Sequence, residues 1–146
     1  GVVAFEFVVK VIDRHIEAAK HNLKGAPIVV AGGYGMGSKE GFDRLFKLAK
    51  ELHGEVGASR AAVDAGFIDH DRQIGQTGVT VHPKVYIACG ISGQIQHIAG
   101  MQDSCIIISV NSDPDAPINK IADYVIIGTV EEIVPKLIKY YKQNSK

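Results

Sequence analysis

The sequence predicts an α/β domain built around a mainly parallel sheet. Its strongest signal is a set of short apolar runs, at 27–31, 85–89, 105–110 and 124–127, in which polar and apolar residues do not strictly alternate. Such runs are typical of strands that are buried on both faces of a parallel sheet. Helical and loop patterns separate the runs, and regular alternation of strands and helices indicates this fold class.

The composition excludes some classes of function. The chain has 146 residues, which suits one domain, and its 16 basic and 16 acidic residues cancel. Balanced charge argues against a nucleic acid or an acidic membrane held by bulk electrostatics, but not against a small anionic ligand. Cys89 and Cys105 lie in apolar runs without motif spacing, so we interpret them as small hydrophobic residues of a reducing compartment. We find neither a membrane-length apolar run nor a signal peptide.

The first 25 residues give a weaker pattern. The stretch from Val2 to Ile12 is rich in Val and Phe and suggests a strand, whereas Arg14 to Leu23 suits a short helix or a crossing segment. We expect residues 1–25 to form a separate N-terminal segment, either an edge strand or a linker from a missing N-terminal domain. Residues 26–146 are expected to form the main domain.

Two amphipathic helices are predicted in more detail. After Ser38 as N-cap and before Gly54 as the stop, one helical face carries Phe42, Leu45, Phe46, Ala49 and Leu52. The last helix follows the same spacing, with Val130, Ile133, Val134, Leu137, Ile138 and Tyr141. Shorter helical segments are expected at 59–64, 93–100 and 117–122. The polar stretch 68–84 predicts a long loop with one short strand at 79–81.

Every predicted strand ends in a polar or glycine-rich loop. These loops begin at Gly32, Gly90, Asn111 and Gly128. The carboxyl ends of parallel strands share one edge of the sheet, which is where open α/β sheets bind ligands. Glycines there let the backbone approach a ligand, and helix N-termini direct N–H groups at anions. The sequence therefore predicts a ligand site at this edge, suited to a cofactor that carries phosphate.

Two of these loops indicate a ligand site with different specificity. Residues 32–37 depart from the G-x-G-x-x-G fingerprint at Ser38, so a tight turn and a phosphate cradle both stay open. Residues 92–97 are more specific, because Gly93 and His97 lie one helical turn apart and a histidine there can hydrogen-bond a ligand carbonyl. The alternative for this cluster is a surface or capping role.

The chain offers little chemistry of its own. Its histidines have no partners at metal-ligand spacing, and no nucleophile motif or pair of carboxylates stands out. We therefore expect no metal site, and a cofactor would have to supply the chemistry.

Four ordered stretches make the chain similar to a known family. GASRAAVDAGF (57–67), IGQTG (74–78), VYIACGISGQIQHIAGM (85–101) and NSDPDAPI with ADY (within 111–124) resemble the FAD-binding domain of the electron transfer flavoprotein alpha subunit. The resemblance extends over residues 27–143. It implies a Rossmann-like, three-layer domain with FAD at the carboxyl edge of the sheet. Family members have a further N-terminal domain, so it also implies an isolated C-terminal domain of an alpha subunit.

The resemblance implies contacts to FAD but no catalytic residue. Arg60 would lie over the flavin ring and favour a negatively charged reduced flavin, Thr77 would place its hydroxyl near N5, and His97 would face the O2 side and stabilise charge there. These three residues would tune the flavin. The implied cofactor-binding residues are Ser59, Arg60, Ile74, Gly75, Gln76, Thr77, Ser92, Gly93, Gln94, Ile95, Gln96, His97 and, at the adenosine end, Asn111.

Three positions depart from the family pattern. Tyr34 stands where an arginine usually contacts the cofactor, Thr129 where an aspartate follows the last strand, and Ser112 where lysine is usual. Tyrosine cannot neutralise a phosphate, and threonine offers no carboxylate. The departures concern the expected phosphate and adenosine contacts and leave the three tuning residues intact.

The implied function is that of an electron carrier rather than an enzyme with its own substrate. Electrons would come from a donor dehydrogenase, commonly an acyl-CoA dehydrogenase of fatty acid β-oxidation, and pass to a redox acceptor. The expected partner is an electron transfer flavoprotein beta subunit in a heterodimer, with no nucleic acid and no membrane insertion, in the bacterial cytoplasm or the mitochondrial matrix. Two alternatives stay open: an NAD-dependent Rossmann-like enzyme domain, and a cofactor-free subunit-interaction domain.

Overall fold

A five-stranded sheet forms the centre of the protein, as a computed structural model that describes residues 1–16 and 22–143 shows. All strand pairs are parallel and the strand order is β2-β1-β3-β4-β5. The strands are β1 (Ile28–Gly32), β2 (Glu55–Ala58), β3 (Val85–Cys89), β4 (Ile106–Asn111) and β5 (Tyr124–Ile127). The predicted α/β class is confirmed, and each predicted apolar run forms a strand.

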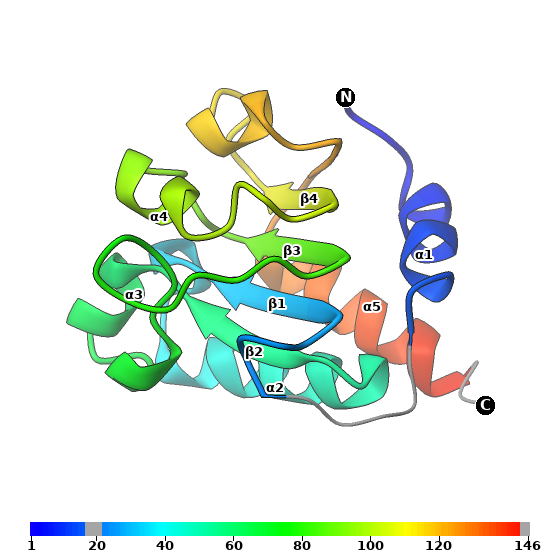
Figure 1. The fold of residues 1–146 in the computed structure, drawn as a ribbon. Coiled ribbons are helices and arrows are strands. Elements are labelled where there is room, and N and C mark those ends of the chain that lie inside the picture. Colours follow the sequence, from blue (N-terminus) through cyan, green and yellow to red (C-terminus); the bar gives the residue numbers. More distant parts are fainter. Residues whose placement is uncertain (17–21, 144–146) are drawn as a thin grey trace.

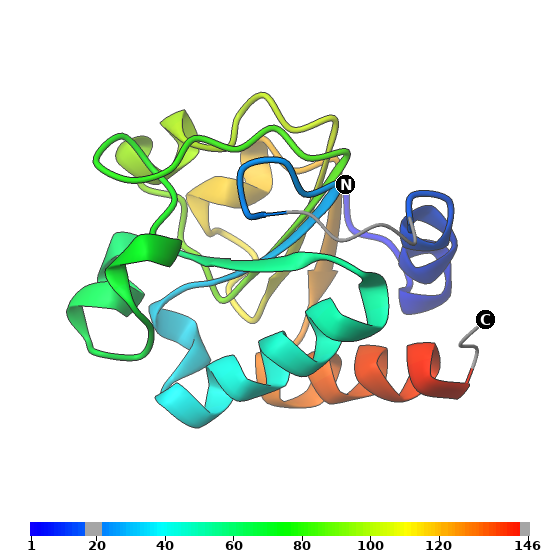
Figure 2. The ribbon, with the colours of Figure 1, turned by 60° about the horizontal axis from the view of Figure 1, so that its bottom comes forward.

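Helices cover both faces of this sheet (Figures 1 and 2). One face packs on α1 (Phe5–Asp13), α2 (Lys39–Leu52) and α5 (Val130–Gln143). The loops after the strands hold η1 (Tyr34–Met36), α3 (Arg60–Asp64), η2 (His70–Arg72), α4 (Ile95–Ala99) and η3 (Pro117–Lys120). Along β3, Val85 and Ile87 contribute to the core under α2 and α5, while Tyr86 and Ala88 contribute to the core on the opposite face. This alternation gives the three layers.

Strand β2 was not predicted, because its four residues carry little strand signal. Glu55 is charged and Gly57 has no side chain, yet the backbone pairs with β1 from Val29↔Glu55 to Gly32↔Ala58. A Cβ atom at Gly57 would lie 2.2 Å from the side chain of Ile74. Glycine here leaves room for the Ile74 side chain, which would have to shift for a larger residue, and this packing accounts for a glycine in a strand despite its low strand preference.

The structure of the N-terminal segment differs from the one predicted. The expected strand over Val2–Ile12 is wrong for most of its length, because Phe5–Asp13 forms α1. Burial of Val8, Val9 and Ile12 on one helical face outweighs the strand preference of β-branched residues. Only the first residues pair with the sheet edge, where Val2 bridges Val125. The segment predicted over 14–23 lies partly outside the described residues.

The two long helices follow their predicted patterns with small differences. Ser38 caps α2 as expected, since its Oγ accepts a hydrogen bond from the Gly41 amide at 3.2 Å. The helix ends at Leu52, and its C-cap His53, which has a φ of 55°, lies one residue before the predicted stop at Gly54. Phe46, predicted to face the core, is 40% exposed and lies 5.0 Å from the guanidinium of Arg72. The expected strand at 79–81 is wrong, since only an isolated bridge from Ile74 to Val79 forms.

Replacing the N-cap tests the helix assignment. Ser38→Ala is expected to lower the free energy of unfolding by about 1 kcal/mol, because the Gly41 amide loses its acceptor. Urea unfolding of the wild type and the variant measures the difference. Ser112→Ala, at an exposed serine in a loop, is the matched control and is expected to change stability little. Equal losses in both variants would contradict a capping role for Ser38.

Candidate functional site

A cleft of about 930 Å³ lies along the carboxyl edge of the sheet. In Figure 1 this is the side with the strand arrowheads, α3 and α4. Loops that follow all five strands contribute to its lining. Such a volume is at the upper end for ligand pockets, and the position is where open α/β sheets bind ligands. The shape suits a large ligand that extends across the sheet.

Nearly all the residues singled out from the sequence line this cleft. They are Ser59, Arg60, Ile74, Gly75, Gln76, Thr77, Ser92, Gly93, Gln94, Gln96, His97 and Asn111. Ile95 does not line it, and its side chain is 82% exposed on α4. The positions that depart from the family pattern, Tyr34, Ser112 and Thr129, also line the cleft.

Sequence reasoning missed other lining residues. Gln73, Asp64, Asp113 and Glu131 contribute side chains to the cleft. Gln73 directly precedes the IGQTG stretch, so its position in the sequence was a usable signal. Asp64 and Asp113 lie within the GASRAAVDAGF and NSDPDAPI stretches, which were a usable signal, whereas Glu131 belongs to no motif.

Two glycine loops meet where the strand order reverses, between β1 and β3. The Gly33 amide donates to the Cys89 carbonyl at 3.0 Å, and the Gly35 amide donates to the Gly90 carbonyl at 3.1 Å. A Cβ atom at Gly35 would lie 2.9 Å from the Gly90 Cα, and Gly90 itself has a φ of +64°. Gly33 and Gly35 therefore serve this backbone contact, which favours the tight-turn interpretation over a phosphate cradle.

The loop from Gln73 to Val79 is held on two sides. The Ile74 amide donates to the Ala58 carbonyl at the end of β2 at 2.8 Å, and the Gln76 amide donates to the Gln96 carbonyl of α4 at 2.9 Å. The Val79 amide closes the turn by donating to the Gln73 carbonyl at 2.8 Å. These bonds fix the loop at the cleft, with Thr77 exposed at its tip.

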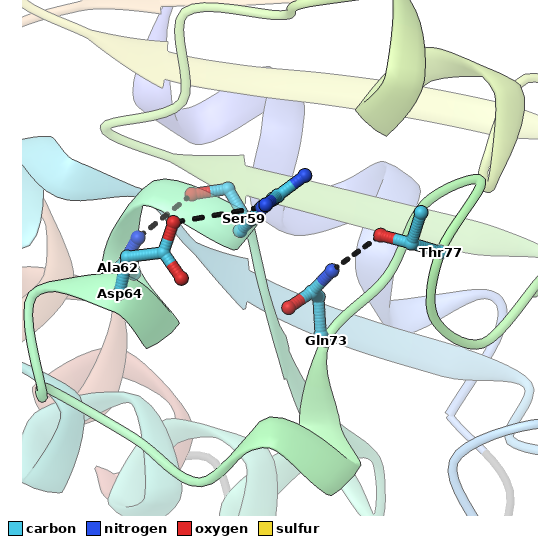
Figure 3. A network of polar contacts seen from close by, with 6 residues as sticks. Ser59, Ala62, Asp64, Gln73 and Thr77 are labelled. Atoms are coloured by element: carbon cyan, nitrogen blue, oxygen red, sulfur yellow. Dashed lines mark hydrogen bonds and ion pairs between the residues drawn. The ribbon is translucent and has the colours of Figure 1, made fainter.

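Arg60 is the residue after the N-cap of α3. Ser59 Oγ accepts a hydrogen bond from the Ala62 amide at 3.4 Å, as Figure 3 shows. The guanidinium of Arg60 forms an ion pair with Asp64 at 3.5 Å, and both side chains are about two-thirds exposed, at 68% and 67%. An exposed pair of this kind contributes little stability, so Arg60 can exchange it for an anionic ligand at small cost.

His97 is buried in the wall of the cleft with both ring nitrogens bonded to the protein. Nδ1 lies 3.1 Å from the Ile74 carbonyl, which can only accept, so Nδ1 carries the proton. Nε2 lies 2.7 Å from the Tyr86 hydroxyl, which then donates to it. Burial lowers the pKa of His97 to about 4. The ring is therefore neutral at physiological pH, and the charge-stabilising role implied for it requires a ligand to exchange one of these hydrogen bonds.

Asn111 links two loops by hydrogen bonds at the other side of the cleft. Its Nδ2 donates to the Ile91 carbonyl at 2.9 Å, and its Oδ1 accepts from the Asp113 amide at 3.0 Å. One amide hydrogen and one lone pair remain for a ligand. Its expected contact with an adenosine group stays a prediction.

The charges that line the cleft are unbalanced. Among its lining residues in the described part of the chain, Arg60 is the only lysine or arginine, against the carboxylates of Asp64, Asp113 and Glu131. Tyr34, which stands in place of the usual arginine, is 67% exposed and stacks on Phe67 with ring centroids 5.9 Å apart. A ligand phosphate bound by this chain alone would thus depend on backbone N–H groups, hydroxyls and side-chain amides.

The described residues contain neither a cluster suited to a metal ion nor a helix suited to cross a membrane. Within 1–16 and 22–143, no three or more His, Cys, Asp or Glu side chains are grouped so that they could hold a metal ion. In the same residues, no helix is long and apolar enough to cross a membrane.

Comparisons with known proteins point to one family. Residues 22–102 match the family described as "Electron transfer flavoprotein FAD-binding domain". The chain is 57% identical over 122 residues to "Protein FixB" of Clostridium saccharobutylicum, covering 84% of this chain and 36% of that protein. It is 56% identical over 122 residues to the "Electron transfer flavoprotein subunit alpha" of Bacillus subtilis, covering 84% of this chain and 38% of that protein. For "Electron transfer flavoprotein subunit alpha, mitochondrial" of Dictyostelium discoideum, identity is 50% over 128 residues, covering 88% of this chain and 36% of that protein.

A solved structure adds information about the fold alone. The chain matches a proposed thiamin diphosphate-dependent enzyme from Mycobacterium smegmatis with a TM-score of 0.51 at 14% identity, covering 92% of this chain and 27% of that one. The chain spans little more than a third of the length of the curated relatives named above. The matched family and these relatives confirm the resemblance seen in the sequence, and the chain belongs to the electron transfer flavoprotein FAD-binding domain family.

Proposed function

We propose that the chain binds FAD in the cleft and acts as the FAD-binding part of an electron carrier. Bound FAD supplies the redox chemistry, taking up electrons from a donor dehydrogenase and releasing them to an acceptor. An acyl-CoA dehydrogenase is the donor we favour, because the resemblance implies it. The proposal also includes a heterodimer with a beta subunit.

The observation that carries the proposal is the lining of the cleft. Residues from sequence-distant motifs line one continuous cleft at the carboxyl edge of the sheet. The set offers a cation in Arg60, hydroxyls in Ser59, Thr77 and Ser92, and several side-chain amides. Such groups hydrogen-bond the carbonyls, ring nitrogens and ribityl hydroxyls of a flavin, so the residues present fit the cofactor.

The unbalanced charge of the lining supports a shared site. FAD carries a pyrophosphate, whereas the lining has one cation against three carboxylates. A further cation from a beta subunit would compensate for the missing arginine at Tyr34. We therefore expect the affinity for FAD to be higher in the heterodimer than in this chain alone.

Absorbance spectroscopy tests the proposed function. The purified chain is incubated with FAD, freed of unbound ligand and scanned, alone and with a beta subunit. Flavin bands near one per chain are expected with the beta subunit present. A protein that stays colourless in both preparations would contradict the proposal and favour the cofactor-free interaction domain, and preference for NAD over FAD would favour the dehydrogenase alternative.

Replacing Arg60 tests its part in tuning the cofactor. Arg60→Ala in the flavin-loaded heterodimer is expected to lower the reduction potential by tens of millivolts, because a positive charge that favours electron uptake is removed. Asp64→Asn is the matched control: it removes the negative partner of Arg60, so the potential is expected to rise or stay unchanged. Redox titration measures both. An unchanged potential in Arg60→Ala would exclude the tuning role.

A further inference from the structure

Gln73 is a buried polar residue in the wall of the cleft. Its side chain is 3% exposed and lines both the main cleft and a smaller cavity of about 240 Å³ beside it. Its amide nitrogen donates to the Thr77 hydroxyl oxygen at 3.0 Å. Figure 3 shows this nitrogen turned to Thr77 and the amide oxygen turned away, toward the side of α3.

The hydrogen bonds of Gln73 and Thr77 leave one group free on each side chain. The amide oxygen of Gln73 has no hydrogen-bond partner among residues 1–16 and 22–143. If the amide were turned over, the nitrogen would lack one instead, so one end stays unpaired in either orientation. The Thr77 oxygen accepts from Gln73, which leaves its own hydrogen free to donate. A buried polar atom without a partner costs stability, so its persistence in a cleft needs an explanation.

We propose that Gln73 recognises the ligand of this cleft. Its amide oxygen accepts a hydrogen bond from an N–H group of the ligand, and its amide nitrogen holds Thr77 so that the threonine hydroxyl donates to a neighbouring acceptor. Together, the side chains of Gln73 and Thr77 would hydrogen-bond one edge of a heterocycle that offers both an N–H donor and a ring-nitrogen or carbonyl acceptor.

The inference rests on the proposed function, since the flavin ring has such an edge. It goes further by assigning two tasks to Gln73. The residue contacts the ligand directly, and it positions Thr77. The loop hydrogen bonds to Ala58 and Gln96 fix the backbone that carries Gln73 and Thr77, so the loop loses little conformational freedom when the ligand binds.

Binding measurements with paired variants test the inference. FAD and 5-deaza-FAD, in which a C–H group replaces the N5 acceptor, are titrated into the heterodimer by flavin fluorescence. The wild type is compared with Gln73→Met, Thr77→Val and the double variant. We expect Gln73→Met to weaken FAD binding about tenfold and to reduce the preference for FAD over 5-deaza-FAD. The double variant is expected to bind better than the product of the single effects predicts, because Thr77 depends on Gln73.

Two further proteins complete the test. Gln102→Met, at an exposed glutamine outside the cleft lining, is the matched control and should bind FAD as the wild type does. Gln73→Glu serves if Gln73→Met fails to fold: a carboxylate keeps the acceptor for the ligand N–H but forces the Thr77 hydroxyl to donate to it. That variant should lose the preference for FAD over 5-deaza-FAD.

The outcomes separate the inference from the proposed function. FAD binding that is indifferent to Gln73, even where thermal stability falls, would overturn the inference and leave the proposed function standing. Absence of FAD binding by every form would overturn both. Selective loss of FAD affinity in the Gln73 variants, with Gln102→Met unaffected, is the supporting result.

Discussion

Acidification from about pH 6.5 to about pH 4 is expected to cost the folded chain roughly 3 kcal/mol through His97 alone. Burial lowers the pKa of this side chain to about 4 in the folded chain, whereas a histidine in the unfolded chain has its ordinary value of 6.5. The unfolded state therefore binds the proton first as the pH falls. The contribution of His97 to stability is fully present above about pH 6.5, declines through the window and levels off below about pH 4.

Unfolding by urea at a series of pH values measures this effect. In His97→Gln the slope of stability against pH over the window should flatten, even though the variant also loses the hydrogen bonds to Tyr86 and Ile74 at every pH. His82→Gln replaces an exposed histidine and is the matched control, with the wild-type slope expected. An unchanged slope in His97→Gln would show that His97 is not buried in its neutral form.

Gly93→Ala is expected to destabilise the chain by roughly 3 kcal/mol or more. Gly93 has a φ of +95°, where a residue with a side chain is strained, and a Cβ atom there would lie 2.7 Å from both the Ile118 amide nitrogen and its Cβ. The Ile118 amide also donates to the Ser92 carbonyl at 2.9 Å, so η3 cannot move away without losing this bond. We expect the 90–97 loop to shift and the affinity for FAD to fall with it.

Gly37→Ala distinguishes the cost of an unfavourable backbone conformation from the cost of a steric clash. Gly37 also has a positive φ, of +81°, but a Cβ atom there would meet nothing within 4 Å. Its replacement should therefore cost only about 1 kcal/mol, as expected for an unfavourable backbone conformation without a clash. Thermal or urea unfolding of both variants measures the difference. Similar losses would mean that the contact with Ile118 is not what requires glycine at position 93.

Much of the fold could be predicted from local patterns. The runs at 85–89 and 124–127 form strands with the predicted bounds, because continuous β-branched and apolar residues suit strands that are buried on both faces. Ser38 caps its helix as expected, and Ser59 caps α3 at the start of the helical segment predicted over 59–64, since capping depends only on residues three positions apart. The position of the cleft also followed from the sequence, because parallel strands bring their carboxyl ends to one edge whatever their separation in the chain.

Other elements were decided by contacts between distant residues. Val2–Ile12 has the composition of a strand, but the space beside α5 and the sheet selects a helix, as the hydrogen bond from the Tyr141 hydroxyl to the Val9 carbonyl illustrates. Strand β2 forms on the template of β1 despite its weak local preference. Local propensities differ by so little that such packing overrides them.

The cleft shows most clearly what the sequence determined and what only the tertiary structure decided. The sequence by itself predicted a ligand site for Thr77 and His97. The family resemblance implied both residues, and the place of His97 in the loop after a predicted strand indicated it independently. Only the tertiary structure decided which of their atoms are free. The hydrogen-bond partners of His97 are 11 and 23 residues away. Burial among such distant residues lowers its pKa, although the bond to the Ile74 carbonyl acts in the opposite direction. Protonation and hydrogen-bond capacity depend on such surroundings, which residue order alone does not specify.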